Sequence, residues 1–220
     1  MRNKKIRQLG VPTLYIMGAG FLIIILIGLF VNGYGNYRKN KISYSYEDLK
    51  SKNTVISEQE IYDFMNYTIF EADSVINDRR EFMKLNCFSL KHSSELKKFI
   101  NSQPETVLTI QDKKYMKSQI KNQIFLWDQD QLINVWCLIP KDLYEVQEDD
   151  ILDYWENFRK LYGNYGHHHY SKPIFNKEKN MVIIEHSGQG GWLLGSGDII
   201  LFRKEKGKWK LIKEQNLWIS

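Results

Sequence analysis

The feature that most constrains this chain is an apolar stretch near its N-terminus. No charged residue occurs between Val11 and Tyr37, and residues 14–31 (LYIMGAGFLIIILIGLFV) are almost wholly apolar. A helix needs about 20 apolar residues, at about 1.5 Å of rise each, to cross the roughly 30 Å core of a bilayer. We therefore predict a transmembrane helix over residues 11–35, preceded by a basic cytoplasmic tail over residues 1–10.

Two alternatives to a retained anchor are a buried core helix and a cleavable signal peptide. A soluble core helix of this length would normally have a polar face, which this stretch lacks. A signal peptide has an apolar region of about 7–15 residues followed by a small-x-small cleavage site. The apolar region here is longer, and its one candidate site is the sequence GYG at residues 33–35. A single-pass signal-anchor fits the sequence best.

Positive charges flank the stretch on both sides. The positive-inside rule places the flank that is richer in Lys and Arg in the cytoplasm. The tail carries the amino terminus with Arg2, Lys4, Lys5 and Arg7, and the other flank carries Arg38, Lys39 and Lys41. This narrow excess predicts a cytoplasmic tail and an extracytoplasmic C-terminal domain. A cytoplasm-facing, membrane-tethered domain is the alternative.

The net charge of +5 belongs to the tail. Of the 31 Lys and Arg residues only four precede Arg38, and none of the 26 acids does, so the rest of the chain is about neutral. Nucleic-acid-binding domains usually present a basic face with arginines, and this chain has 24 lysines but only 7 arginines. We expect no nucleic-acid partner. The expected partners are the bilayer, through residues 11–35, and an unknown protein or small ligand.

Helical patterns precede strand patterns in the remainder of the chain. We expect a juxtamembrane linker over residues 36–56 and a globular domain over residues 57–220. The spacing of apolar residues predicts helices near residues 57–76, 94–100, 112–123 and 149–163. Residues 132–139 form either a buried strand or the end of a helix.

Short apolar runs separated by glycines follow in the last third of the chain. They predict strands at residues 181–184, 192–194, 199–202 and 208–213, with a hairpin loop at residues 204–207. The glycines of residues 188–191 and 195–197 are expected in turns between these strands. Helices followed by strands are typical of an α+β fold, here with a C-terminal antiparallel β-meander.

The C-terminal quarter carries a recognisable pattern. It consists of SKPIFN at residues 171–176, the glycine-rich residues 188–197, GKWK at residues 207–210 and LWIS at residues 217–220. This pattern resembles an uncharacterised family of small bacterial proteins that are membrane-anchored or secreted. The resemblance implies a location in the bacterial envelope and carries no known chemistry. The closing hairpin also looks like the final strands of nuclear-transport-factor-2-like or cystatin-like domains.

Three consecutive histidines at residues 167–169 form the most suggestive chemical cluster. Consecutive side chains of a strand point to opposite faces, so at most two of the three converge. A metal site would need His168 to be joined by Glu185 and His186, and it would indicate a metal-assisted hydrolase of the envelope. We favour a surface loop without a ligand, because such motifs are weakly specific.

Other polar and aromatic clusters have ordinary structural interpretations. The acids at residues 145 and 148–150 are expected to cap a helix, where the positive end of the helix dipole favours them. Trp192, Trp209 and Trp218 are expected mainly in the core, with an exposed binding patch as the alternative. Neither a Gly-x-Ser-x-Gly nor a His-Glu-x-x-His motif occurs, so we expect no catalytic residue and no cofactor.

The two cysteines, Cys87 and Cys137, are fifty residues apart. In an oxidising compartment they would form one disulfide, and otherwise they would be two separately buried free thiols. Both alternatives remain open from the sequence. Taken together, the sequence predicts a membrane-anchored, extracytoplasmic binding or interaction domain, with an envelope enzyme as the alternative.

Overall fold

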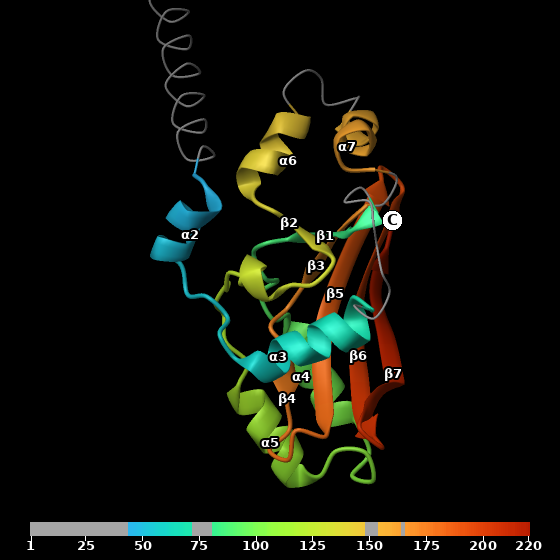
Figure 1. Cartoon of the computed structure of the whole chain (residues 1–220). Coiled ribbons are helices and arrows are strands. Elements are labelled where there is room, and N and C mark those ends of the chain that lie inside the picture. The colour runs from blue at the N-terminus through green and yellow to red at the C-terminus, as the bar shows by residue number, and fades with distance from the viewer. Residues whose placement is uncertain (1–43, 72–80, 148–153, 164–165) are drawn as a thin grey trace, which may run out of the picture. The chain divides into compact units, whose positions relative to one another are not determined.

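The computed structural model describes residues 44–71, 81–147, 154–163 and 166–220 (Figure 1). The chain divides into two units, residues 1–44 and residues 45–220, and the second is the one described below. The predicted tail and the predicted transmembrane helix over residues 11–35 lie outside the described residues. Among the helices that are described, none is both long and apolar enough to cross a bilayer.

A mixed sheet runs through the domain in the strand order β2-β1-β3-β5-β6-β7, and β4 also pairs with β5. β1 is parallel to both β2 and β3, whereas β3 is antiparallel to β5. β5, β6 and β7 form an antiparallel meander. The strands are β1 (Met83–Asn86), β2 (Val135–Leu138), β3 (His167–Tyr170), β4 (Ile174–Phe175), β5 (Met181–Gly191), β6 (Leu194–Glu205) and β7 (Lys208–Ile219). The α+β class and the C-terminal meander are confirmed, and the parallel strands extend the sheet beyond the prediction.

The helices begin where the sequence supplies side-chain caps. Ser45 and Thr109 each form a capping box with the aspartate three residues later, and the Ser93 hydroxyl accepts a hydrogen bond from the Leu96 N–H. Such caps satisfy N–H groups that have no partner within the helix. The helices are α2 (Tyr46–Lys52), α3 (Gln59–Phe64), η1 (Met65–Ile69), α4 (Ser94–Ser102), α5 (Ile110–Ser118), η3 (Gln129–Gln131), α6 (Pro140–Val146) and α7 (Tyr154–Tyr162).

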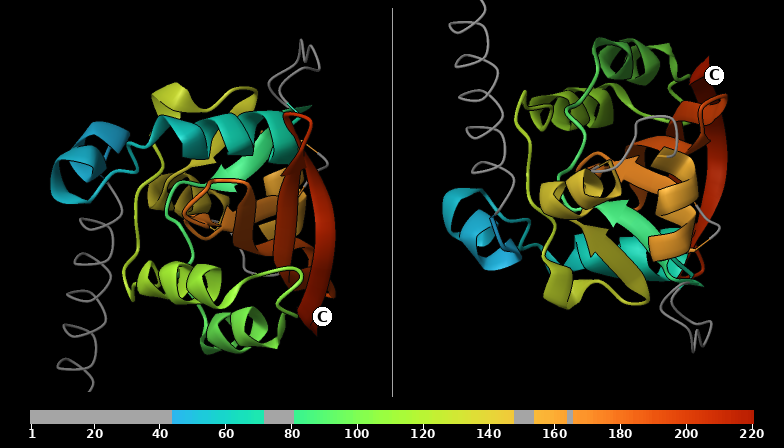
Figure 2. Two further views of the ribbon diagram at one scale, coloured as in Figure 1. Left: turned by 90° about the horizontal axis from the view of Figure 1, so that it is seen from below. Right: turned by 90° about the horizontal axis from the view of Figure 1, so that it is seen from above.

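Alternate residues of β5 enter two separate cores. Val182 and Ile184 pack with Phe64 of α3 on one face of the sheet, whereas Ile183 packs with Phe99 of α4 on the other face. This alternation follows from the period of two of a strand. Figure 2 shows α3 on one side of the sheet and α4 and α5 on the other. The central strands are therefore buried on both faces.

A third apolar cluster lies at one end of the sheet, where α6 and α7 pack on β2 (Figure 1). Trp155 and Phe158 of α7 are buried against Leu138 and Val146. Their spacing is three residues, so both side chains lie on one face of α7. This cluster fixes α7 beside the start of β3.

The structure corrects or bounds the sequence prediction at several places. The helix expected over residues 57–76 is α3 continued by the π-helix η1, which ends at Ile69. Of the strand expected over residues 192–194, Trp192 and Leu193 form the hairpin turn and Leu194 begins β6, because β5 and β6 continue through the glycines that were expected in turns. The helix opening at residue 149 is described only from Tyr154. The histidines form β3 and not a surface loop.

Candidate functional site

His168 and His186 meet on one face of the sheet. The register pairs Tyr170 with His186 and His168 with Gly188, so the two histidines are diagonal neighbours on β3 and β5. His168 Nδ1 lies 2.9 Å from His186 Nε2. The His186 ring also stacks on the Tyr170 ring, with their centroids 4.7 Å apart. His167 points the other way and stacks on Trp155 at 5.7 Å. Only one of the three consecutive histidines therefore joins His186.

Asp198 extends this pair into a polar row across three strands. Asp198 lies opposite His186 in the register of β5 and β6, and its Oδ2 is 3.7 Å from His186 Nδ1. The Asp198 carboxylate also accepts hydrogen bonds from Asn216 Nδ2 at 2.9 Å and from Ser196 Oγ at 3.2 Å. Asp198 was not predicted from the sequence, because only the strand register brings it to the histidines.

The position of the carboxylate favours one arrangement of protons. A proton on His186 Nδ1 faces Asp198, which leaves His186 Nε2 as an acceptor for the Nδ1–H of His168. His168 Nε2 then carries a lone pair. Burial, together with His186 and His167, lowers the pKa of His168 to about 4. Burial also lowers the pKa of His186, although Asp198 opposes that shift. Both rings are therefore neutral at pH 7.

Glu185 does not join the two histidines. Because it is adjacent to His186 on β5, its side chain lies on the opposite face of the sheet. Both carboxylate oxygens are 3.1 Å from the Ser93 N–H, at the start of α4. The set of His168, Glu185 and His186 considered for a metal is thus not assembled. The described part of the chain contains no group of three His, Cys, Asp or Glu side chains that could hold a metal ion.

A hollow of about 410 Å³ opens beside the histidine pair. A Cβ atom at Gly188 would lie 3.2 Å from His168 Nδ1 and 3.3 Å from the His186 ring. Glycine at this position therefore lets the two rings approach the strand, whereas the sequence had indicated a turn. The hollow is also lined by Gly166, Gln189, Gly190, Leu194, Gly195, Ser196, Ile219 and Ser220.

A larger cleft of about 660 Å³ lies between the α3–η1 segment and the turns that precede β5 and β7. Three aromatic side chains form its floor: Phe64 is 5.4 Å and Phe175 is 5.9 Å from the Trp209 ring, measured between centroids. Trp209 was expected mainly in the core. It is half-buried and borders this cleft.

The two walls of this cleft, which we call the α3–β7 cleft, carry opposite charges. Glu60, Asp63 and Glu71 line the side formed by α3 and η1, and Lys179, Lys204 and Lys208 line the other side. Lys179 forms an ion pair with Glu60 across the cleft. Lys204 Nζ lies 5.6 Å from the centroid of the Trp209 ring. The sequence does not predict this site, because acids on a helix and lysines in hairpin turns are common surface residues. Only the fold brings these two groups together.

Cys87 and Cys137 form a disulfide in the structure, with their Cα atoms 5.1 Å apart. Cys87 follows β1, and Cys137 lies within the parallel neighbour β2. The Cys87 N–H donates to the Leu138 carbonyl at 2.9 Å. The disulfide therefore joins two adjacent strands, and both cysteines are buried.

The other tryptophans and acids considered from the sequence do not gather at one site. Trp218 lies over Gly197, where an added Cβ would be 2.0 Å from the indole nitrogen. Trp192 is exposed at the turn between β5 and β6. Glu145 forms an ion pair with Lys141 on α6, and the acids of residues 148–150 lie outside the described residues.

Comparison with known proteins returned no relative. No family model matches this chain, and no curated protein or solved structure shows significant similarity to it.

Proposed function

We propose that this chain is a single-pass protein of the bacterial envelope whose extracytoplasmic domain binds a peptide segment in the α3–β7 cleft. The observation that supports this proposal is the cleft itself, with an aromatic floor between one acidic and one basic wall. The anchor over residues 11–35 and the excess of positive charge in the tail support the location.

The dimensions and the chemistry of the cleft suit such a ligand. Binding sites for small molecules and short segments commonly measure about 300–1,000 Å³ and combine an apolar lining with a few polar groups. The half-buried ring of Trp209, which packs on the buried Phe64, offers contact area for an apolar side chain. The acids of α3 and η1 would bind a cationic group, and Lys204 and Lys208 would bind an anionic one. A peptide segment supplies all three features.

A photo-crosslinking experiment in membranes tests this proposal. A photoreactive phenylalanine analogue is placed at Tyr67, which lines the cleft and is 56% exposed. The matched control is the same analogue at Ile110, which is 67% exposed on α5. We expect a discrete protein adduct from position 67 that position 110 does not give. The adduct should disappear in the double variant Lys204→Glu/Lys208→Glu.

Two results would contradict binding in the cleft. One is the same adducts from both positions, and the other is an adduct that persists after reversal of the two lysine charges. Both lysines are exposed, so their replacement should leave the fold intact. Thermal unfolding of the double variant checks that assumption.

An envelope enzyme is a second candidate, and the histidine pair favours it. His168 Nε2, left with a lone pair beside the 410 Å³ hollow, could accept a proton from a bound substrate. Without Glu185 the proposed metal-assisted mechanism loses its third ligand. His168→Gln tests whether the histidine site and the cleft are independent, in which case crosslinking at position 67 should be unchanged. Loss of the adduct in that variant would link the two sites.

A further inference from the structure

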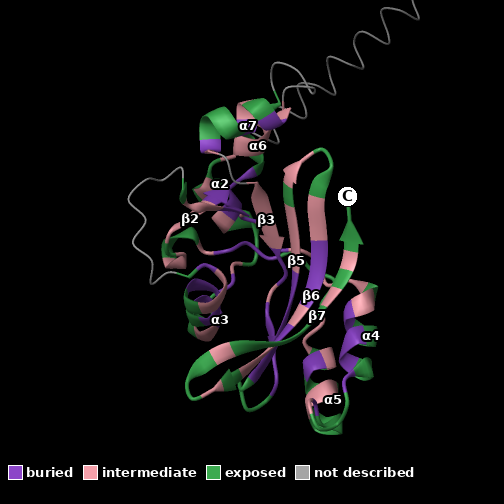
Figure 3. Cartoon of the chain, turned by 90° about the vertical axis from the view of Figure 1, so that its right-hand side faces the viewer, coloured by how far each residue is buried: buried purple, intermediate pink, exposed green. Residues whose placement is uncertain are grey.

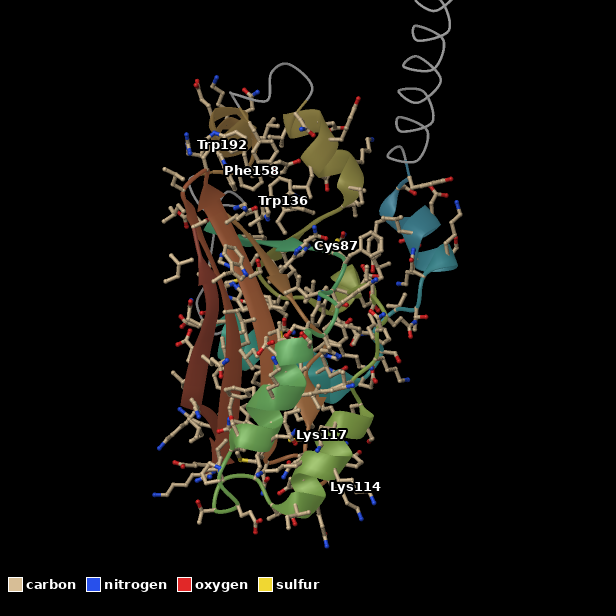
Figure 4. The ribbon with its side chains drawn as sticks, turned by 180° about the vertical axis from the view of Figure 1, so that it is seen from behind. Cys87, Lys114, Lys117, Trp136, Phe158 and Trp192 are labelled. Atoms are coloured by element: carbon tan, nitrogen blue, oxygen red, sulfur yellow. A yellow bond between two sulfur atoms is a disulfide. The ribbon has the colours of Figure 1, made fainter. Side chains whose placement is uncertain are left out.

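Three apolar residues project from the turn between β5 and β6. Trp192 is 58%, Leu193 86% and Leu194 66% exposed. Figure 3 marks the tip of this hairpin as exposed, and Figure 4 shows Trp192 at the end of the strands, near α7. The Trp192 ring contacts the domain at Tyr154, with centroids 6.3 Å apart. The tip is thus held in place by the domain while most of its apolar surface faces outward.

The hairpin residues on either side of this tip carry no charge. No charged residue occurs in residues 187–197, whose other members are Ser, Gly and Gln. Ile219, which pairs with Ser196 on the neighbouring strand, is 78% exposed. Turns that face water normally carry polar residues, and a contiguous exposed apolar patch marks a contact surface. The tip therefore suits an apolar or interfacial environment.

The length of the linker brings the bilayer within reach of this tip. Residues 36–44 connect the predicted transmembrane helix to the domain, and nine residues span at most about 31 Å when extended. A compact domain of this size has a diameter of about 40 Å. The anchor therefore keeps the domain within about one domain diameter of the bilayer, whose surface is available to an exposed apolar tip. No other expected partner is kept at so short a distance.

We propose that the hairpin tip of Trp192, Leu193 and Leu194 inserts into the surface of the bilayer and gives the domain a second membrane contact. Tryptophan prefers the level of the lipid headgroups, and leucine prefers the acyl boundary below it. Because the domain is about neutral, the insertion depends on apolar burial and not on anionic lipid. This inference rests on the proposed membrane anchor.

Flotation with phosphatidylcholine vesicles tests the insertion. The protein is the domain of residues 45–220, which forms a compact unit with its own cores, so the anchor itself cannot contribute. We expect the domain to float with the vesicles equally at 0.1 M and 0.5 M salt, since apolar contacts are not screened. Leu193→Asp should weaken vesicle partitioning about tenfold or more. The control Ile110→Asp, at an exposed apolar residue of α5, should leave it unchanged.

Quenching by brominated lipid adds a structural readout. The fluorescence of the wild-type domain should be quenched on vesicle binding, and Trp192→Phe should remove most of that quenching. Failure of the wild-type domain to float overturns the proposal, as does equal loss in the Ile110→Asp control. A concentration-dependent dimer that Leu193→Asp abolishes would assign the tip to a second copy of the chain and overturn it too. A negative crosslinking result at Tyr67 would leave this experiment unaffected.

Discussion

At the scale of single residues, the histidines of β3 and β5 make the stability of the domain depend on pH. The pKa of His168 falls from the ordinary 6.5 to about 4 on burial. Between those values the unfolded chain binds more protons than the folded domain, so stability rises with pH. We expect the free energy of unfolding to fall as the pH drops from 6.5 to 4, by up to about 3 kcal/mol for His168 alone.

Urea denaturation of the domain at several pH values measures this dependence. His168→Gln removes the titrating ring and keeps an amide that can bond to His186, so its curve should be flatter than that of the wild type between pH 6.5 and 4. His169, whose pKa burial also lowers to about 4, adds a similar contribution that remains in the variant. An unchanged slope in His168→Gln would show that His168 is not held neutral.

A second prediction at this scale concerns Glu185, whose side chain contacts the start of α4 and not the two histidines. Its carboxylate accepts the Ser93 N–H at the start of α4, and the side chain is buried. Glu185→Ala leaves that N–H without an acceptor, which should cost about 1–3 kcal/mol of stability. Glu185→Gln keeps one acceptor oxygen and should cost less. Chemical denaturation of the two variants checks the order, and equal losses would contradict the hydrogen bond as the cause.

At the scale of elements, the disulfide joins the two parallel strands at the edge of the sheet. It closes a loop of about fifty residues between Cys87 and Cys137. The chain-entropy model assigns such a loop about 4 kcal/mol of stabilisation. We expect a reductant to lower the urea midpoint of the wild-type domain markedly. The double variant Cys87→Ala/Cys137→Ala should unfold at a lower midpoint that the reductant does not change. A wild-type midpoint insensitive to full reduction would contradict this expectation.

The elements that the sequence predicted best are those that local interactions determine. α4 begins at the cap Ser93, and its apolar residues repeat at helical spacing, so nearby residues alone specify it. The helix predicted over residues 112–123 is α5, which begins earlier, after the cap Thr109, and ends at Ser118. β1 and β3 were missed for the opposite reason. His167–Tyr170 shows no apolar alternation, and Met83–Asn86 alternates over only four residues. Both become strands through pairing with partners far along the chain.

The candidate sites also combine features that local sequence predicts with features that depend on distant strand pairing. The sequence indicated that His168 and His186 could converge, because both lay near expected strands. It could not separate His186 from Glu185, since the face that each occupies depends on the register of β5. Asp198 and the α3–β7 cleft required the complete sheet. A cleft built from residues as distant as Glu60 and Lys204 leaves no local pattern in the sequence.

At the scale of the whole molecule, the orientation of the predicted anchor determines on which side of the membrane the domain lies. The native cysteines cannot report this orientation, because both are buried in a disulfide. Cys87 and Cys137 are 0% and 6% exposed, so a thiol reagent would not reach them in the folded domain even after reduction. Lys114 is exposed on α5, at the far end of the domain from Cys87 (Figure 4). The full-length variant Lys114→Cys therefore provides an accessible thiol.

If the four basic residues of the tail keep the amino terminus in the cytoplasm, as we propose, the domain faces outward and a membrane-impermeant maleimide should label Lys114→Cys in intact cells. The unsubstituted chain is the control and should stay unlabelled before denaturation. Labelling that appears only after lysis would place the domain in the cytoplasm. The tail exceeds the other flank by only one basic residue plus the amino terminus, so the charge difference that favours this orientation is small. Replacing Arg2 and Lys4 with Gln should therefore invert part of the population and reduce labelling in intact cells.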